Sequence, residues 1–274
     1  MKASETARGS WDLFVSPLHL DELLDGFPVP VGAVTSDNQP DPAGGQIDSI
    51  TSRYPTAAQT IAQADRPLVL AGDCLSSLAT VAALQRRNRD VSVIWLDAHG
   101  DFNTPAISTS GYLAGMSLAM LTGRAFELIG QPIGLRPVPD ERVVLVDARD
   151  LDPAERDLLD ASRIRRVAAD PRAVRDATAE LSPSDIYLHL DVDIIDSRQV
   201  PGLRWDAGAG PSFSTVEDCL TEIVDVAPPV AACIACPWPS HLIAEASTRD
   251  VVSRLAAAIG AELQWTADRT ASSS

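Results

Sequence analysis

Two short acidic runs carry the residues best suited to chemistry. Asp97, His99 and Asp101 occupy alternate positions of one run. Asp191 and Asp193 do the same in another. In extended backbone alternate side chains share a face, so each run is predicted to project its side chains together. If the two runs converge, four carboxylates and an imidazole repel one another unless cations neutralise them.

Carboxylates with an imidazole suit Mn²⁺, whereas a zinc site would be expected to contain more thiolates. Two such ions about 3.5–4 Å apart can activate water at neutral pH. A single Asp-x-Asp run is most often a helix cap or a turn former. Here a third segment, Gly72-Asp73-Cys74, also follows an apolar run, and three such segments together indicate a hydrolytic metal site.

The elements that position these segments follow from apolar periodicity. Strands are predicted at Asp12–Val15, Pro67–Ala71, Val91–Leu96, Arg142–Val146, Ile186–Leu190 and Val230–Ile234. Helices are predicted at Leu75–Arg87, Pro153–Leu159, Pro171–Glu180, Ser214–Val226 and Ala246–Leu263. Several strands are apolar throughout, as in parallel sheets covered on both faces. The fold class is therefore α/β, a mostly parallel doubly wound sheet between helical layers, with ligands outside the carboxyl ends of its strands.

Composition narrows the class of protein. The 274 residues carry a net charge of −16, which argues against binding nucleic acid through its phosphates. No apolar run approaches the roughly 18 residues of a membrane span. The polar N-terminus predicts a cytoplasmic protein, in which disulfides among the four cysteines are not expected. We expect one domain over 1–274, with a loop at 36–45 and a flexible tail at 266–274.

The three segments resemble the metal-binding signatures of the arginase/agmatinase (ureohydrolase) superfamily, and the resemblance extends over about 67–239. It implies an arginase-like three-layer αβα sandwich. It also implies two Mn²⁺ ions per chain, held by Cys74, Asp97, His99, Asp101, Asp191 and Asp193. In that scheme Asp97 and Asp191 bridge the ions, Cys74 and Asp101 complete one site, and His99 and Asp193 complete the other. Asp101 would also act in catalysis, by moving a proton from the attacking water to the leaving amine.

Two further segments favour the arginase branch. The loop containing Asn103 and Ser110 resembles the one that holds the α-carboxylate of arginine, and Asp152 and Glu155 stand where that branch holds the α-amino group. Amide and hydroxyl donors suit a carboxylate, and two acids suit an ammonium. The resemblance implies a small α-amino acid with a guanidino or hydroxyguanidino end as partner. The alternative is a plain turn at Asn103 and the start of a helix at Asp152.

Four positions depart from the family pattern. Cys74 replaces a histidine ligand, Ala114 replaces a proton-shuttling histidine, Cys236 aligns with an acid that holds the guanidinium, and Trp205 replaces a small hydroxyl residue. These losses handicap hydrolysis of arginine, whose guanidinium is strongly basic. A hydroxyguanidine is less basic and is more easily attacked while neutral. The pattern therefore predicts an amidinohydrolase that converts Nω-hydroxy-L-arginine to L-ornithine and hydroxyurea, similar to the branch that serves D-cycloserine biosynthesis.

Three alternatives stay open. One is a plain arginase, and another is a non-catalytic member that binds an amino acid or metal. A third and weaker one is a formiminoglutamate-type hydrolase. Cys74 is interpreted as a ligand, although a buried inert thiol is the alternative. His19, His189 and His241 have no convincing partners in the sequence and are given structural or surface roles, and the oligomeric state is left open.

Overall fold

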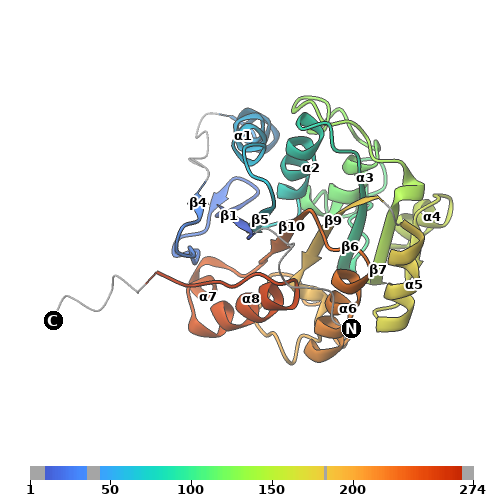
Figure 1. Ribbon diagram of the computed structural model, residues 1–274. Coiled ribbons are helices and arrows are strands. Elements are labelled where there is room, and N and C mark those ends of the chain that lie inside the picture. The colour runs from blue at the N-terminus through green and yellow to red at the C-terminus, as the bar shows by residue number, and fades with distance from the viewer. Residues whose placement is uncertain (1–9, 36–43, 182–183, 267–274) are drawn as a thin grey trace.

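A parallel sheet forms the centre of the chain. The computed structural model describes residues 10–35, 44–181 and 184–266. Eight strands lie in the order β4-β1-β5-β10-β9-β6-β7-β8, and every neighbouring pair is parallel (Figure 1). Their bounds are β1 (Asp12–Ser16), β4 (Val34–Thr35), β5 (Pro67–Ala71), β6 (Val91–His99), β7 (Val143–Asp150), β8 (Arg165–Val167), β9 (Asp185–Asp191) and β10 (Ala231–Ala235). A small antiparallel pair, β2 (Leu18–His19) and β3 (Glu22–Leu23), lies beside it.

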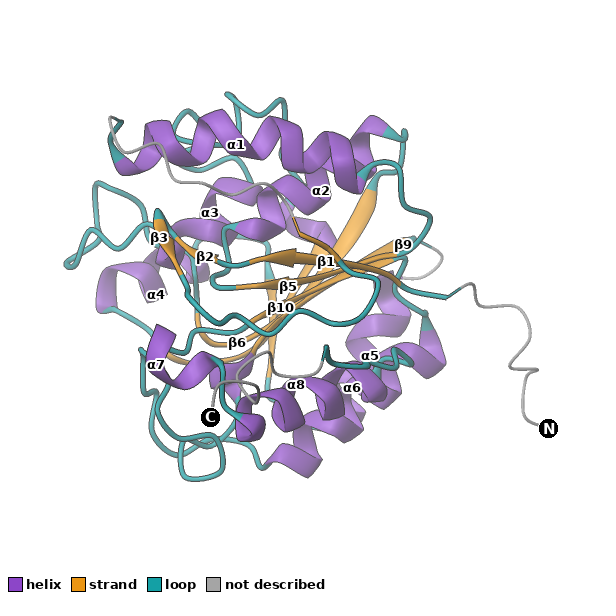
Figure 2. Cartoon of the chain, turned by 90° about the vertical axis from the view of Figure 1, so that its left-hand side faces the viewer, coloured by secondary structure: helices purple, strands orange, loops and turns teal. Residues whose placement is uncertain are grey.

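Helices cover both faces of this sheet (Figure 2). On one side the core contains buried residues of α1 (Gln46–Ile61), α2 (Ser76–Arg86), α3 (Ser117–Leu121) and α4 (Pro153–Asp160). The core on the other side contains residues of α5 (Pro171–Leu181), α6 (Phe213–Val226), α7 (Ser240–Ile243) and α8 (Ala246–Ala258). The predicted three-layer α/β fold is confirmed.

The six predicted strands are all present: β5 has the predicted bounds, and the other five are displaced by one to a few residues at one or both ends. The helix predicted over Ala246–Leu263 is wrong at its end, because the helix stops at Ala258. Gly260 follows with a φ of +79°, a left-handed conformation that glycine adopts easily and that terminates helices. Most of the predicted loop 36–45 and all but one residue of the predicted tail 266–274 lie outside the described residues.

The topology brings distant segments to one sheet edge. The central strands β5, β10, β9 and β6 are neighbours although the chain reaches them in a different order. Being parallel, they end on the same side. Leu96 of β6 pairs with Leu190 of β9, so the acids that follow them, Asp97 and Asp191, stand level on adjacent strands. None of the described helices is long and apolar enough to cross a membrane.

Candidate functional site

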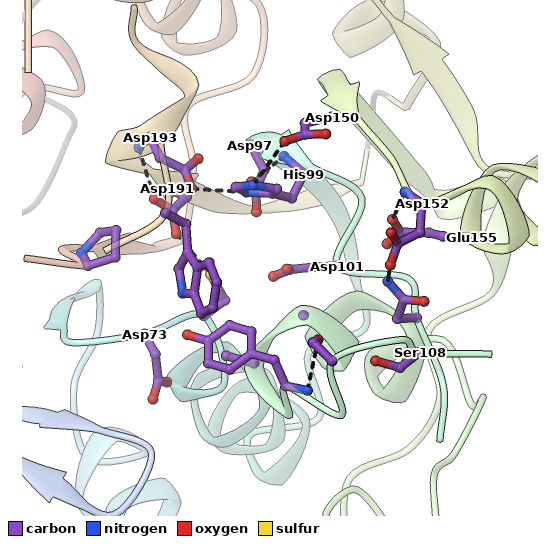
Figure 3. A pocket seen from close by; sticks show the side chains of 18 of the residues that line it. Asp73, Asp97, His99, Asp101, Ser108, Asp150, Asp152, Glu155, Asp191 and Asp193 are labelled. Atoms are coloured by element: carbon purple, nitrogen blue, oxygen red, sulfur yellow. Dashed lines mark hydrogen bonds and ion pairs between the residues drawn. The ribbon is translucent and has the colours of Figure 1, made fainter. Parts of the chain in front are cut away.

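A cavity of about 250 Å³ opens at the carboxyl ends of these strands. All ten residues singled out from the sequence line it: Cys74, Asp97, His99, Asp101, Asn103, Ser110, Asp152, Glu155, Asp191 and Asp193. Figure 3 shows two groups of these side chains, with Asp97, His99, Asp191 and Asp193 on one side and Asp152 and Glu155 on the other. Asp101 lies between them (Figure 3).

Two overlapping clusters could each hold a metal ion. One comprises Asp97, His99 and Asp193. The other comprises Cys74, Asp97, His189 and Asp191. Within each cluster the candidate ligand atoms lie within 4.8 Å of one another, and Asp97 belongs to both. Asp101 lines the same cavity but belongs to neither cluster of the described residues.

The predicted convergence of the acids is present, but extended backbone does not produce all of it. The strand β6 ends at His99, and Asp101 beyond it has a left-handed φ of 49°. Asp193 lies in a 3₁₀ turn, Val192–Ile194, and Asp191 caps this turn at the backbone N–H group of Asp193. There the Asp191 carboxylate accepts a hydrogen bond of 2.9 Å from the Asp193 backbone nitrogen. The expectation of simple alternation along both runs is therefore wrong beyond His99 and Asp191.

A bulge in the neighbouring strand helps to shape this edge. Asp147 and Ala148 of β7 have φ values of 77° and 47°, where the register with β6 shifts. Bulges of this kind redirect side chains next to functional sites. The side chain of Arg149 then donates hydrogen bonds to the carbonyl oxygens of Ile194 (3.0 Å) and Asp193 (3.1 Å) and pairs with Asp147. Arg149 thereby fixes the turn that carries Asp193.

The acids of the clusters repel one another. Burial, followed by the charges of Asp97 and Asp191, raises the pKa of Asp101 well above its ordinary value. Burial and the charges of Asp193 and Asp97 do the same to the pKa of Asp191. The thiol of Cys74 also has a raised pKa, from burial and neighbouring carboxylates, and it donates a hydrogen bond of 3.0 Å to Asp191. Cations at this point would reverse all of these shifts.

His99 is the one cationic partner within the first cluster. Burial alone would lower its pKa, but hydrogen bonds and charges from Asp193 and Asp97 outweigh burial and raise the pKa to about 12. Its Nδ1 lies 3.0 Å from Asp193 Oδ2 and 3.5 Å from Asp97 Oδ1. Asp150, which sequence reasoning missed, lines the cavity with Oδ2 3.9 Å from His99 Nε2.

The sequence predicts a structural or surface role for His189, yet it belongs to the second cluster. Its Nδ1 lies 2.8 Å from the Ser77 hydroxyl, and its ring stacks on Trp95 with centroids 3.7 Å apart. Burial lowers its pKa to about 3, so the imidazole is neutral. The signal was present in the sequence, because His189 stands two residues before Asp191 in β9 and so shares its face.

The donor set fits divalent metal ions. Apart from the sulfur of Cys74, the candidate ligands are carboxylate oxygens and imidazole nitrogens, which Mn²⁺ accepts. Asp101 Oδ2 is buried and, among the described residues, has no hydrogen-bond partner. A buried carboxylate oxygen without a partner is costly, and a cation or a bound water would satisfy it. The structure therefore supports a metal centre here, and the residues that hold it remain our prediction.

The opposite side of the cavity is built for polar groups. The Asn103 side-chain amide donates to Asp152 Oδ2 at 3.3 Å. Its own oxygen is buried and lacks a partner in the part of the chain that the structure describes. The hydroxyl of Ser110 accepts a hydrogen bond from the Tyr112 backbone nitrogen at 3.2 Å, which orders the loop around it. Asn103 and Ser110 are thus held in place at the cavity wall.

Glu155 serves the local fold as well as the cavity. Its carboxylate accepts hydrogen bonds from the backbone nitrogens of Phe102 (2.8 Å) and Asp152 (3.3 Å). It is 3% exposed, and burial raises its pKa. A Cβ at Gly100 would lie 2.7 Å from Glu155 Oε1, so glycine is required for this approach. Asp152 is the N-cap of α4, so the helix start that was the alternative to a substrate-binding role is confirmed, and Asp152 lines the cavity as well.

The positions that depart from the family pattern fall into two groups. Cys74, Ala114 and Trp205 line the cavity, and Trp205 packs against Tyr112 with ring centroids 4.8 Å apart. Cys236 instead belongs to the core on the opposite face of the sheet. The cavity wall of the described chain has Pro237 at this point. The residue that aligns with the guanidinium-binding acid of the family, Cys236, is therefore not among the described residues that line the cavity.

Comparison with known proteins agrees with this geometry. The model of the Arginase family matches residues 27–260. The N(omega)-hydroxy-L-arginine amidinohydrolase of Streptomyces lavendulae is 34% identical over 148 residues, 53% of this chain and 51% of that protein. The arginase of Brevibacillus brevis is 36% identical over 157 residues, 54% and 53% of the two chains. The match thus spans about half the length of these relatives.

A solved structure extends the likeness to the whole fold. The arginase from Bacillus caldovelox has a TM-score of 0.78 with 21% identity, over 91% of this chain and 97% of that chain. At this identity the likeness shows the fold alone. The family match and the fold therefore agree, and both include the strands that carry the two clusters.

Proposed function

Because the chain belongs to the arginase family, we propose that it is a metal-dependent amidinohydrolase that hydrolyses Nω-hydroxy-L-arginine to L-ornithine and hydroxyurea. The observation that carries the proposal is one cavity in which a buried cluster of metal-type ligands faces the polar wall of Asn103, Asp152 and Glu155. A guanidino carbon can face the first group only if the amino-acid end occupies the second. The cavity of about 250 Å³ suits a ligand of this size.

The metal ions, for which we propose Mn²⁺, would supply electrostatic activation of water and of the guanidino group when bound. Asp101 lies between the two walls, where it can accept the proton of the attacking water and deliver it to the departing δ-amine. Asn103 and Ser110 donate hydrogen bonds to the α-carboxylate, and Asp152 and Glu155 accept them from the α-ammonium. Holding this end positions the guanidino carbon for attack.

The hydroxylated substrate is supported by what the cavity lacks. Ala114 offers no titratable group, and Cys236 is a core residue that is not among the described residues lining the cavity. A strongly basic guanidinium would therefore lose two of its expected partners, whereas a neutral hydroxyguanidine needs them less. The Streptomyces lavendulae relative is named for this activity. We place the reaction, as a hydroxyurea source, in antibiotic biosynthesis of the D-cycloserine type.

A plain arginase is the second candidate, because the Brevibacillus brevis relative is named arginase and has a similar identity to this chain. The discriminating measurement is ornithine release by Mn²⁺-loaded protein with each substrate at neutral pH. We expect kcat/KM for Nω-hydroxy-L-arginine to exceed that for L-arginine by at least about 100-fold, equivalent to about 2.7 kcal/mol. The reverse preference would make the protein a plain arginase. No turnover despite bound metal would contradict both activities, and no bound metal would favour a non-catalytic member.

Recognition of the amino-acid end can be tested at Asn103, whose side chain lines the cavity. We expect Asn103→Ala to lower kcat/KM about 10–100-fold, because a hydrogen bond to a charged group contributes about 1.5–3 kcal/mol. The control is the same substrate without its α-carboxylate. Its turnover should be low with the unaltered protein and should change little on substitution. An equal loss with both substrates would mean that Asn103 acts through the fold.

A further inference from the structure

His189 is a buried imidazole that the proposed catalysis has not used. It is 0% exposed, and its Nε2 has no hydrogen-bond partner among the described residues. One of its ring nitrogens lies within 4.8 Å of the candidate ligand atoms of Cys74, Asp97 and Asp191. A buried polar atom that lacks a partner is rare and calls for an explanation. The neighbouring ligand cluster provides one.

We propose that His189 is a metal ligand, binding through Nε2 the ion that Cys74, Asp97 and Asp191 also hold. The inference rests on the proposed metal centre but not on the identity of the substrate. The second cluster then contains an imidazole that the motif spacing does not predict. Each ion would then have one histidine, His99 for the first and His189 for the second.

The surroundings of His189 favour a ligand over a plain core residue. Its Nδ1 is 2.8 Å from the Ser77 hydroxyl, in the first turn of α2. Ligating imidazoles typically donate their other ring N–H to such an acceptor, which fixes the tautomer and aims the free nitrogen at the metal. Trp95 stacks on the ring and also donates a hydrogen bond of 3.1 Å to Asp97 Oδ2. One tryptophan therefore orients two members of the same cluster.

The strand register gives a reason for the arrangement. His189 pairs with Trp95 of β6 and with Cys233 of β10, one level deeper in the sheet than Asp97 and Asp191. Cys74 lies in the short segment between β5 and α2. The imidazole of His189 therefore comes from within β9, whereas the sulfur of Cys74 comes from the segment after β5. The four candidate ligands thus come from three central strands of the sheet and their ends, β5, β6 and β9, and their ligand atoms lie within 4.8 Å of one another.

The first test counts bound metal without substrate. Protein loaded with Mn²⁺ and passed through a desalting column is analysed for metal per chain, for the unaltered protein, His189→Gln and His241→Gln. His241 is exposed on α7 and controls for the loss of an imidazole. We expect about two equivalents of Mn²⁺ per chain for the unaltered protein and for His241→Gln, and about one for His189→Gln. Two equivalents in His189→Gln, with unchanged affinity, would overturn the proposal.

Since His189 is stacked in the core, His189→Gln could fail to fold, and a second measurement uses the unaltered protein. X-ray absorption of Co²⁺-loaded protein counts imidazole rings around the ions. We expect two rings per pair of ions, whereas one ring, that of His99, would overturn the assignment. Ser77→Ala gives a milder check, because loss of such an outer partner should weaken one metal site about 10–100-fold. Neither readout depends on which substrate is hydrolysed.

Discussion

Replacing Asp193 by alanine is expected to lower kcat by at least about 1,000-fold, equivalent to about 4 kcal/mol. Asp193 is 4% exposed, and its Oδ2 lies 3.0 Å from His99 Nδ1 in the first cluster. Its Oδ1 also accepts a hydrogen bond of 3.3 Å from the Ala98 backbone nitrogen, which holds β6 against the turn after β9. The substitution therefore removes one ligand and the anchor of another. We expect the variant to bind one metal equivalent fewer.

The measurement is ornithine release together with metal content, on protein whose folding is checked by circular dichroism. A matched control is Asp157→Ala, because Asp157 is an exposed acid on α4. That variant should retain both metal and turnover. Undiminished turnover of Asp193→Ala with full metal content would remove Asp193 from the site.

Removal of metal is expected to destabilise the protein increasingly as pH rises from about 5 to 8. An ion at 100 times its dissociation constant stabilises the fold by about 2.7 kcal/mol. For a chain of this size that corresponds to roughly 5–10 °C in Tm, at about 2–4 °C per kcal/mol. We expect chelation to lower Tm by at least this amount. A chain that is not held by metal would show no difference.

The pH dependence follows from the raised pKa values of the stripped site. Asp101 and Asp191 have folded-state pKa values above the ordinary 3.8, and that of His99 is raised from 6.5 to about 12. At a pH between the unfolded-state and the folded-state pKa of each group, the folded chain holds more protons than the unfolded chain. The free energy of unfolding therefore falls as pH rises. Bound cations displace these protons and reverse the trend. A gap in Tm between loaded and stripped protein that narrows with pH would contradict this account.

The sequence predicted the sheet well, because its central strands are apolar throughout and are bounded by turn residues. It did not predict α1, whose sequence contains Pro55 within the helix. A proline normally ends or bends a helical pattern, so periodicity alone argued against this element. The two-residue strand β4 and the three-residue β8 are too short to give a pattern.

The site shows a similar division. Residue type and spacing identified ten side chains that the fold does bring to one cavity. They did not give the left-handed backbone of Asp101 or the turn at Asp193, because these depend on packing between β6, β7 and β9. Nor could they assign His189, whose role depends on Ser77 and Trp95 far away in the chain. Nor did they show that Cys236 lies in the core outside the cavity lining, because a single strand does not reveal which of its side chains reach the cavity.

The sheet order has a consequence for how the chain folds. Ala98 and Asp193 are hydrogen-bonded although they are 95 residues apart, and Cys74 and Asp191 meet across 117 residues. Contacts of such long range form slowly, because the entropy cost of closing a large loop comes before the contacts contribute any favourable free energy. Since β9 fits between β6 and β10, neither cluster exists in a partly folded chain that lacks it. Metal uptake during refolding would therefore follow the pairing of β9 with β6, and the ions would bind this pairing once formed without guiding the chain towards it.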